Sequence, residues 1–75
     1  MKLKELNLNE IGVVVGYSTQ DHNYRKKIVR MGLIKNTEFK VIRKAPLGDP
    51  IEIELRGFRL TLRGNEANVL EVEKR

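Results

Sequence analysis

The chain has 75 residues, which is the size of one small domain and leaves no room for a second hydrophobic core. Its 15 lysines and arginines outnumber 10 acidic residues, and the net charge of +5 favours acidic partners such as nucleic acid, anionic lipid or an acidic protein surface. There are no cysteines, which excludes disulfides, thiolate metal sites and cysteine nucleophiles and favours a reducing compartment. The longest apolar run, 13–15, is too short to cross a bilayer, so we expect a soluble cytoplasmic protein without direct membrane insertion.

The first part of the chain is expected to form an irregular start, a strand and a loop. Leu3, Leu6 and Leu8 follow mixed spacings, which predicts an irregular lid or a single helical turn. The β-branched run 13–15 lies between two glycines and predicts a strand over Ile11–Tyr17. A polar loop is expected over Ser18–Asn23.

A helical period begins at Tyr24. Tyr24, Ile28 and Met31 recur on one helical face, which we expect to pack on the core. This predicts a short amphipathic helix of about two turns over 24–31. The rest of its surface is basic and consists of Arg25, Lys26, Lys27 and Arg30.

Suitable residues flank this helix at both ends. Asp21 or Asn23 can cap the N-terminus by accepting hydrogen bonds from free backbone N–H groups. Gly32 can take the left-handed conformation after the last turn, which brings Leu33 back against Ile28. The Met31-Gly32-Leu33 corner is therefore mainly a structural cap that sets the angle of the helix.

The second half of the chain predicts strands joined by tight turns. Phe39–Lys44 and Ile51–Leu55 are expected to be strands on either side of loop 45–50. Pro46 and Gly48 fit the second and fourth positions of a type I turn in that loop. A polar corner over 65–67 and a short strand over Val69–Val72 follow.

A hairpin with a two-residue loop at Arg56-Gly57 has a register fixed by two signals. On one face it pairs apolar residues only: Leu55 with Phe58, Ile53 with Leu60, and Ile51 with Leu62. On the other face it sets Glu54 opposite Arg59 and Glu52 opposite Thr61. A slip of one residue would lose both the apolar pairs and the charge pair.

These elements predict a mainly β fold in a single domain, 1–75. Five short strands, tight turns and one small helix indicate a closed or nearly closed small barrel. An exposed edge at Phe39–Lys44 would allow weak self-association, although small barrels usually close that edge. The sequence leaves this point open.

Several segments resemble the ferrous iron transport protein A (FeoA) family over nearly the whole chain. The matching segments are Met31-Gly32-Leu33, residues 39–42, the run Ala45-Pro46-Leu47-Gly48-Asp49-Pro50-Ile51, Arg56-Gly57, and Leu60-Thr61-Leu62-Arg63 followed by Ala67. One departure is Lys35-Asn36-Thr37, where the family usually has Pro-Gly-Thr, but asparagine also tolerates a left-handed conformation.

The resemblance implies a fold and a role. The family has an SH3-like β-barrel and is an accessory or regulator of the membrane ferrous iron transporter, whose cytosolic portion binds GTP. The family is thought to dock on the transporter rather than to carry iron, and a related domain occurs fused to iron-dependent repressors. A free-standing chain of this size fits the first setting better.

The charge distribution and one protruding turn suggest where a partner docks. Residues 25–44 contain eight basic residues and one acidic residue, a net charge of +7, whereas the rest of the chain carries −2. Leu47 lies in a protruding turn, where folding back onto the barrel is slightly favoured over contact with a partner. A basic helix face is also compatible with plain solvation. The predicted docking residues are Arg25, Lys26, Lys27, Arg30, Met31, Leu33, Pro46, Leu47 and Asp49, and Arg56, Arg59 and Arg63 form a second basic strip.

The sequence argues against a metal site, a cofactor and an enzyme. The segment 21–23 and the pair Glu52 and Glu54 offer ligands, but one histidine and no cysteine give no recognisable multi-ligand spacing. The single serine, Ser18, has no evident base, and no glycine-rich phosphate loop is present. We therefore expect no metal, no cofactor and no catalysis.

The alternative function is a small basic barrel that binds nucleic acid phosphates. The four aromatic residues are Tyr17, Tyr24, Phe39 and Phe58. Phe39 and Phe58 fall at apolar positions, and Tyr24 lies on the apolar helix face, so no exposed stacking platform is expected. We accordingly expect no nucleic acid partner.

Overall fold

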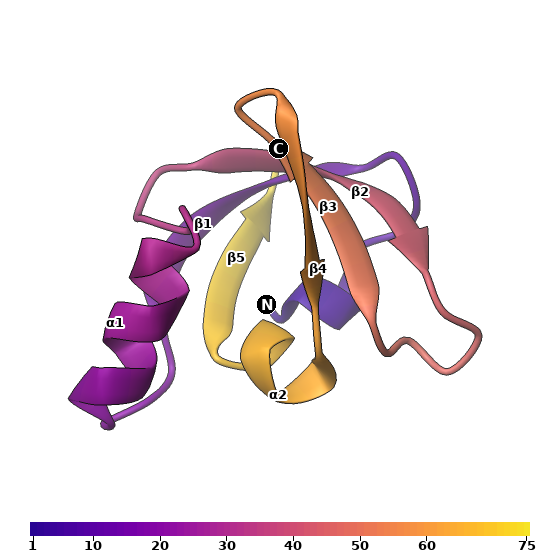
Figure 1. The fold of residues 1–75 in the computed structure, drawn as a ribbon. Helices are drawn as coiled ribbons and strands as arrows, with labels where there is room; N and C mark the ends of the chain where they lie inside the picture. The colour runs from indigo at the N-terminus through magenta and orange to yellow at the C-terminus, as the bar shows by residue number, and fades with distance from the viewer.

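The computed structural model describes residues 1–75 as one curved sheet of five antiparallel strands with three short helical segments (Figure 1). The sheet has the order β4-β3-β2-β1-β5, so β4 and β5 are its two edges, and the barrel is not closed between them. No helix is long and apolar enough to span a membrane. The strands are β1 (Ile11–Tyr17), β2 (Glu38–Lys44), β3 (Ile51–Leu55), β4 (Phe58–Leu62) and β5 (Leu70–Lys74), and the helical segments are the 3-10 turn η1 (Leu3–Glu5), α1 (His22–Arg30) and α2 (Gly64–Ala67).

The strands follow the predicted pattern closely. The bounds of β1 and β3 are those predicted, β2 begins one residue earlier, and β5 covers Leu70–Lys74 rather than Val69–Val72. The β3–β4 hairpin has every predicted pair, from Leu55 opposite Phe58 to Ile51 opposite Leu62. Arg56 and Gly57 have φ angles of +49° and +83°, which a two-residue loop of type I′ requires.

The helix α1 begins two residues earlier than predicted, within the expected polar loop. Asp21 is the N-cap: its Oδ1 accepts hydrogen bonds from the N–H groups of Asn23 at 2.9 Å and Tyr24 at 3.2 Å. Gly32 has a φ of +101°, which confirms the predicted left-handed residue after the helix. Asn36 also has a left-handed φ of +71°, so the asparagine does replace the glycine usual in the family at this turn.

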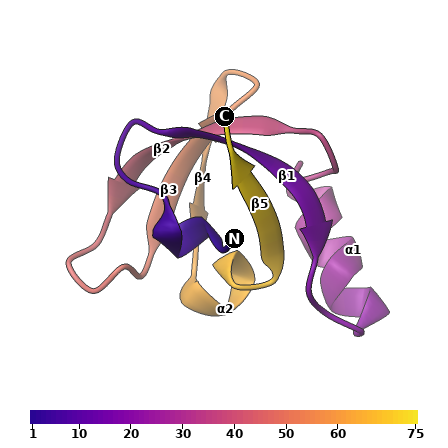
Figure 2. The same ribbon diagram turned by 180° about the vertical axis from the view of Figure 1, so that it is seen from behind.

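The core lies inside the curved sheet, with η1 and α2 at the lower opening of the sheet and α1 along one side (Figure 2). Gly12 allows a close approach there, because a Cβ at this position would lie only 2.7 Å from Cζ of Phe39 and 2.9 Å from Cδ1 of Leu6. The predicted polar corner 65–67 is a short helix, α2, and its Ala67 belongs to the core. The other core residues are Leu3, Leu6, Val14, Ile28, Leu33, Phe39, Val41, Ile51, Ile53, Leu55, Leu62, Leu70 and Val72.

Two carboxylates tie the ends of the chain to the barrel. The Asn7 N–H donates to Glu10 at 2.7 Å, and the Lys74 ammonium lies 2.6 Å from the other oxygen. These two hydrogen bonds hold the pKa of Glu10 below its ordinary value of 4.5, and the bond from Asn7 has the larger effect. The Lys2 ammonium donates to Glu71 and likewise lowers the pKa of that carboxyl.

The sheet order decides whether Phe39–Lys44 is an exposed edge, a point that the sequence leaves open. The strand β2 lies in the interior of the sheet, between β3 and β1. The β5 edge is partly covered, because Val72 exchanges backbone hydrogen bonds with Met1 at 2.9 and 3.0 Å. The strand β4 is left as the uncovered edge.

Candidate docking surfaces

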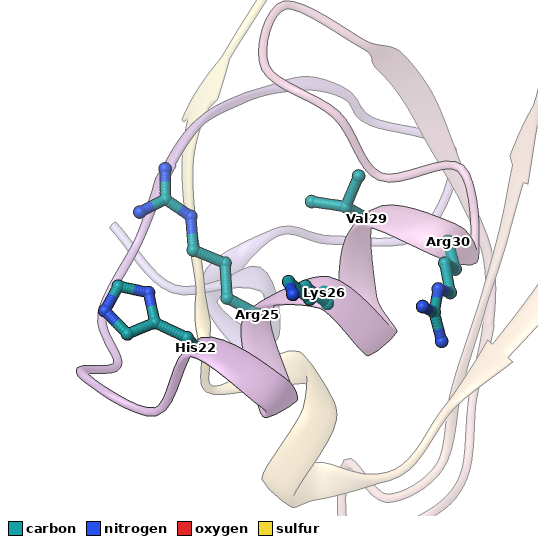
Figure 3. A pocket seen from close by; sticks show the side chains of 5 residues that line it. All are labelled: His22, Arg25, Lys26, Val29 and Arg30. Atoms are coloured by element: carbon teal, nitrogen blue, oxygen red, sulfur yellow. The ribbon is translucent and has the colours of Figure 1, made fainter.

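The outward side of α1 carries basic side chains around a shallow hollow of about 340 Å³ (Figure 3). All of its lining residues belong to α1 itself, so the hollow has no opposing wall and does not form an enclosed ligand site. Figure 3 shows the side chains spreading along the helix without converging on one point. The lining residues are His22, Arg25, Lys26, Val29 and Arg30.

The four predicted basic residues of α1 are not equivalent. The Lys27 ammonium lies 3.3 Å from an Oε of Glu66 in α2, so its charge already has a partner within the chain. The Arg25 guanidinium lies 5.0 Å from the centre of the Tyr17 ring, in a cation–π contact. The charged groups of Lys26 and Arg30 make no hydrogen bond or ion pair within the chain, and both residues are exposed.

The corner after α1 is held by two polar side chains. The Tyr17 hydroxyl donates a hydrogen bond to the carbonyl oxygen of Leu33 at 2.6 Å. Burial raises the pKa of this tyrosine, and the nearby Arg25 opposes the shift. From the hairpin loop, the Arg56 guanidinium donates to the Gly32 carbonyl oxygen and to Oγ1 of Thr37, both at 3.0 Å. The α1 helix therefore leaves the barrel at a fixed angle.

The loop between β2 and β3 presents an unprotected apolar side chain. The Gly48 N–H donates to the carbonyl oxygen of Ala45 at 2.7 Å, which confirms the tight turn predicted there. Leu47, at the third position of this turn, is 96% exposed, so the expectation that it folds back onto the barrel is wrong. A turn of this kind directs its central side chains away from the hydrogen bond that closes it, and no other segment covers Leu47.

Three predicted docking residues instead hold the fold together. Leu33 is fully buried in the core and is removed from the predicted set, because the left-handed Gly32 turns it inward. Met31 is half-buried and packs against the core. Asp49 is exposed, but its Oδ1 accepts a hydrogen bond from the N–H of Gly64 at 2.9 Å, where α2 begins.

The remaining residues form two separate surfaces. We call Arg25, Lys26 and Arg30 the α1 face, and Pro46 and Leu47 the turn surface. In Figure 1, α1 lies at the left of the barrel and the β2–β3 loop at the right, and the reversed view in Figure 2 again separates them across the molecule. The two surfaces therefore lie on different sides of the molecule.

The family model described as the FeoA domain matches residues 1–74. The chain belongs to the FeoA domain family. This confirms the resemblance drawn from the sequence.

One curated relative of this FeoA domain is a much longer protein. It is an Fe(2+) transport protein A/Fe(2+) transporter FeoB fusion protein from Porphyromonas gingivalis, 32% identical over 73 residues. The match covers 97% of this chain but only 8% of that fusion protein.

Solved structures confirm the predicted fold. A FeoA-like protein from Clostridium acetobutylicum has 38% identity and a TM-score of 0.85, with 99% of this chain and 85% of that one covered. A FeoA from Stenotrophomonas maltophilia, solved in complex with zinc, has 28% identity and a TM-score of 0.81, with 97% and 89% covered. That relative is described as a procaryotic SH3 domain protein, so this FeoA domain has an SH3-like fold.

The acidic residues of this FeoA domain do not gather into a metal-binding group. No cluster of three or more histidine, cysteine, aspartate or glutamate side chains is present. Glu52, considered above as a ligand, lies instead 3.9 Å from Arg43 and 3.7 Å from Arg59. The register places Glu54 opposite Arg59, but the ion pair of this arginine runs diagonally to Glu52.

One aromatic residue of this FeoA domain, Phe58, is more exposed than the sequence predicts. Phe58 is 44% exposed, although it stands at an apolar position of the hairpin. It is the first residue of the edge strand β4, so no further strand covers its ring. Its Cζ would lie 3.3 Å from a Cβ at Gly32, so the ring sits beside the corner that follows α1.

Sequence reasoning also missed the role of Arg56. The sequence predicts a second basic strip of Arg56, Arg59 and Arg63, whereas the guanidinium of Arg56 bonds the corner after α1. Its position in a two-residue loop is visible in the sequence. The partners on Gly32 and Thr37 depend on how the hairpin folds over that corner, which no local pattern reveals.

Proposed function

We propose that this FeoA domain is a cytoplasmic accessory protein of ferrous iron uptake that docks on the GTP-binding part of the membrane ferrous iron transporter. The observation that carries the proposal is the Porphyromonas gingivalis relative, in which Fe(2+) transport protein A and the transporter FeoB share one chain. Fusion keeps two modules at a high effective concentration, which favours their association. The role is regulatory and requires no catalytic residue in this domain.

The α1 face supplies the electrostatic part of this docking. The ammonium of Lys26 and the guanidinium of Arg30 have no partner within the chain, so an acidic surface pairs with them without breaking an internal contact. Complementary charges of this kind chiefly raise the rate of association and fix the orientation of the complex. Because the corner after α1 is held by Arg56, the helix needs no ordering before it binds.

The turn surface supplies an apolar anchor. Leu47 is 96% exposed, and an apolar pocket on the partner would remove nearly its whole side chain from water. The two surfaces lie on opposite sides of the barrel, so a single flat interface does not cover both (Figure 1). We infer that the domain links two parts of the transporter and so changes their relative arrangement.

Ferrous iron uptake in cells that lack this protein tests the proposed function. Uptake should be restored by the wild-type chain, and only weakly by Leu47→Asp or by Lys26→Glu with Arg30→Glu, at matched expression. Lys35→Glu is the matched control, because this exposed lysine lies outside both surfaces. Undiminished uptake in cells without the protein would contradict an accessory role.

A binding measurement with the purified cytosolic part of the transporter tests the two-surface arrangement. The α1 variant should bind more slowly, with a salt-dependent association rate, whereas Leu47→Asp should dissociate faster. The free energies of the two changes should add in the combined variant, because distant sites are independent. If either variant binds as the wild type does, that surface does not contact the transporter.

The nucleic acid alternative rests on net charge and on one exposed ring, that of Phe58. Single-strand binding generally uses several rings in succession, and Tyr24 and Phe39 are half-buried and buried. Titration with duplex and single-stranded oligonucleotides separates the two functions. A tight complex that weakens steeply with salt would favour nucleic acid over the transporter.

A further inference from the structure

The strand β4 is a free sheet edge. On one side it pairs with β3 over its whole length, and it has no strand on the other. The opposite edge, β5, is partly covered through the hydrogen bonds between Val72 and Met1. In Figure 1, β4 stands at the front of the barrel as the last strand of the sheet. An uncovered edge is a template for another extended chain.

The register identifies the backbone groups that are free. In a hairpin with a two-residue loop, the residues that flank the loop exchange hydrogen bonds, and this pattern alternates along the strands. Because Leu55 pairs with Phe58, the N–H and C=O groups of Arg59 and Thr61 point away from β3. No side chain or loop bonds these groups. Both residues are exposed, so the groups are accessible to a partner.

The side chains around this edge select the chemistry of the partner. Residues 55–65 contain three arginines and no acidic residue, a net charge of +3. Arg59 and Thr61 project from the outer face, and Arg63 follows just beyond the strand. On the inner face, Phe58 is 44% exposed and Leu60 is half-buried, which leaves an apolar margin.

A second copy of this chain does not fit the same edge. Pairing of two β4 strands would bring two segments of charge +3 side by side, and like charges across strands destabilise a sheet. Charged edge residues commonly prevent self-pairing in this way. Arg56 bonds the corner after α1, and Arg59 is paired with Glu52 at 3.7 Å. The attraction for an acidic strand therefore comes mainly from Arg63, whose guanidinium makes no hydrogen bond or ion pair within the chain, and from the net positive charge of the segment.

We propose that β4 binds an extended acidic segment of a partner protein by strand addition. The segment pairs with the backbone groups of Arg59 and Thr61 and continues the antiparallel sheet. Its acidic side chains lie on the outer face near Arg59 and Arg63, and its alternate apolar side chains cover Phe58 and Leu60. This site is separate from the α1 face and the turn surface.

The test uses a labelled peptide of about eight residues in which glutamate and valine alternate, with blocked ends. Thr61→Pro removes the outward N–H without removing a bond to β3, and Thr61→Val is the matched control that keeps this group. We expect Thr61→Pro to weaken binding at least about tenfold and Thr61→Val to leave it within about twofold. The amide signals of Arg59 and Thr61 should shift on binding, and their hydrogen exchange should slow.

A second measurement needs no variant of the protein. The same peptide with N-methyl groups on alternate residues keeps its charge and side chains but cannot donate the ladder hydrogen bonds, so it should bind the wild type at least about tenfold more weakly. Equal binding of the two peptides, or of the two Thr61 variants, overturns strand addition. Loss of binding in Lys26→Glu with Arg30→Glu, with shifts confined to α1, also overturns it. A dimer that Thr61→Pro dissociates would replace the acidic partner by a second copy.

Discussion

Leu47→Asp separates a residue that contacts a partner from one that supports the fold. Leu47 is 96% exposed, so the substitution removes almost no buried apolar area. Exposed substitutions of this kind change the free energy of unfolding by less than about 0.5 kcal/mol. For a domain of this size, the corresponding shift in Tm is less than about 4 °C.

The effect on docking should be much larger. Full burial of a leucine side chain contributes about 1.5 to 3 kcal/mol, and every 1.4 kcal/mol is tenfold in Kd. The loss of this contact should therefore weaken binding to the cytosolic part of the transporter by about 10- to 150-fold. An aspartate placed in an apolar pocket adds the cost of removing its charge from water.

Calorimetric titration and a thermal melt of the same samples measure both quantities. Leu47→Met keeps size and apolar character and should bind nearly as the wild type, whereas Leu47→Asn separates the loss of apolar contact from the added charge. A Tm far below that of the wild type would show that Leu47 supports the core. A Kd unchanged in Leu47→Asp would exclude the turn surface from the interface.

Three further predictions concern stability. Ile53→Ala should lower the free energy of unfolding, measured in urea, by about 2 to 5 kcal/mol. The total for a domain of 75 residues is about 4 to 11 kcal/mol. A loss below about 1 kcal/mol would contradict the assignment of Ile53 to the core. Gly12→Ala should lower the free energy of unfolding by about 1 to 3 kcal/mol, because its Cβ would clash with Phe39 and Leu6. Gly16→Ala should be nearly neutral, because no atom lies within 4 Å of a Cβ there. Equal losses in the two variants would refute the steric argument. The pKa values of Glu10 and Glu71 are lowered in the folded protein, so both carboxylates stabilise the fold above pH 4.5. This stabilisation is lost as the pH falls through their pKa values in the folded state. The double variant Glu10→Gln with Glu71→Gln should therefore show a urea midpoint that depends less on pH in the acid range.

The hairpin could be predicted in full because its information is local. Leu55 and Phe58 are separated by only two residues, and the apolar alternation and the Glu54–Arg59 pair specify the same register. The sequence alone does not fix the start of α1, since Asp21 and Asn23 are equally good caps in isolation. The structure selects Asp21, whose carboxylate reaches two backbone N–H groups.

The exposure of single side chains could not be predicted in the same way. Leu33, Leu47 and Phe58 are all apolar residues next to turns, yet one is fully buried and the others are 96% and 44% exposed. Their exposure depends on which distant segment covers the turn. Leu33 is turned into the core after α1, whereas nothing crosses the β2–β3 loop, and β4 has no outer neighbour.

The eight basic residues of segment 25–44 do not form one surface patch in the structure. A helix and a strand distribute consecutive residues over several directions, so adjacent basic residues do not form one patch. Lys27 faces Glu66, and the Lys44 ammonium donates to the carbonyl oxygens of Lys4 and Leu6 at 2.8 and 2.7 Å. These contacts use charge to hold the fold, and they leave fewer cations for a partner than the sequence count implies.

The backbone of the helix that carries the free cations is anchored at its C-terminal corner. Arg56 and Tyr17 hold the corner after α1 from two sides, through the carbonyl oxygens of Gly32 and Leu33. A helix held in this way needs little backbone ordering on binding, which reduces the entropic cost of docking. The hairpin loop, which does not belong to the α1 face, therefore determines how that face meets an acidic partner. Substitutions at Arg56 should consequently change docking without removing a single surface charge from α1.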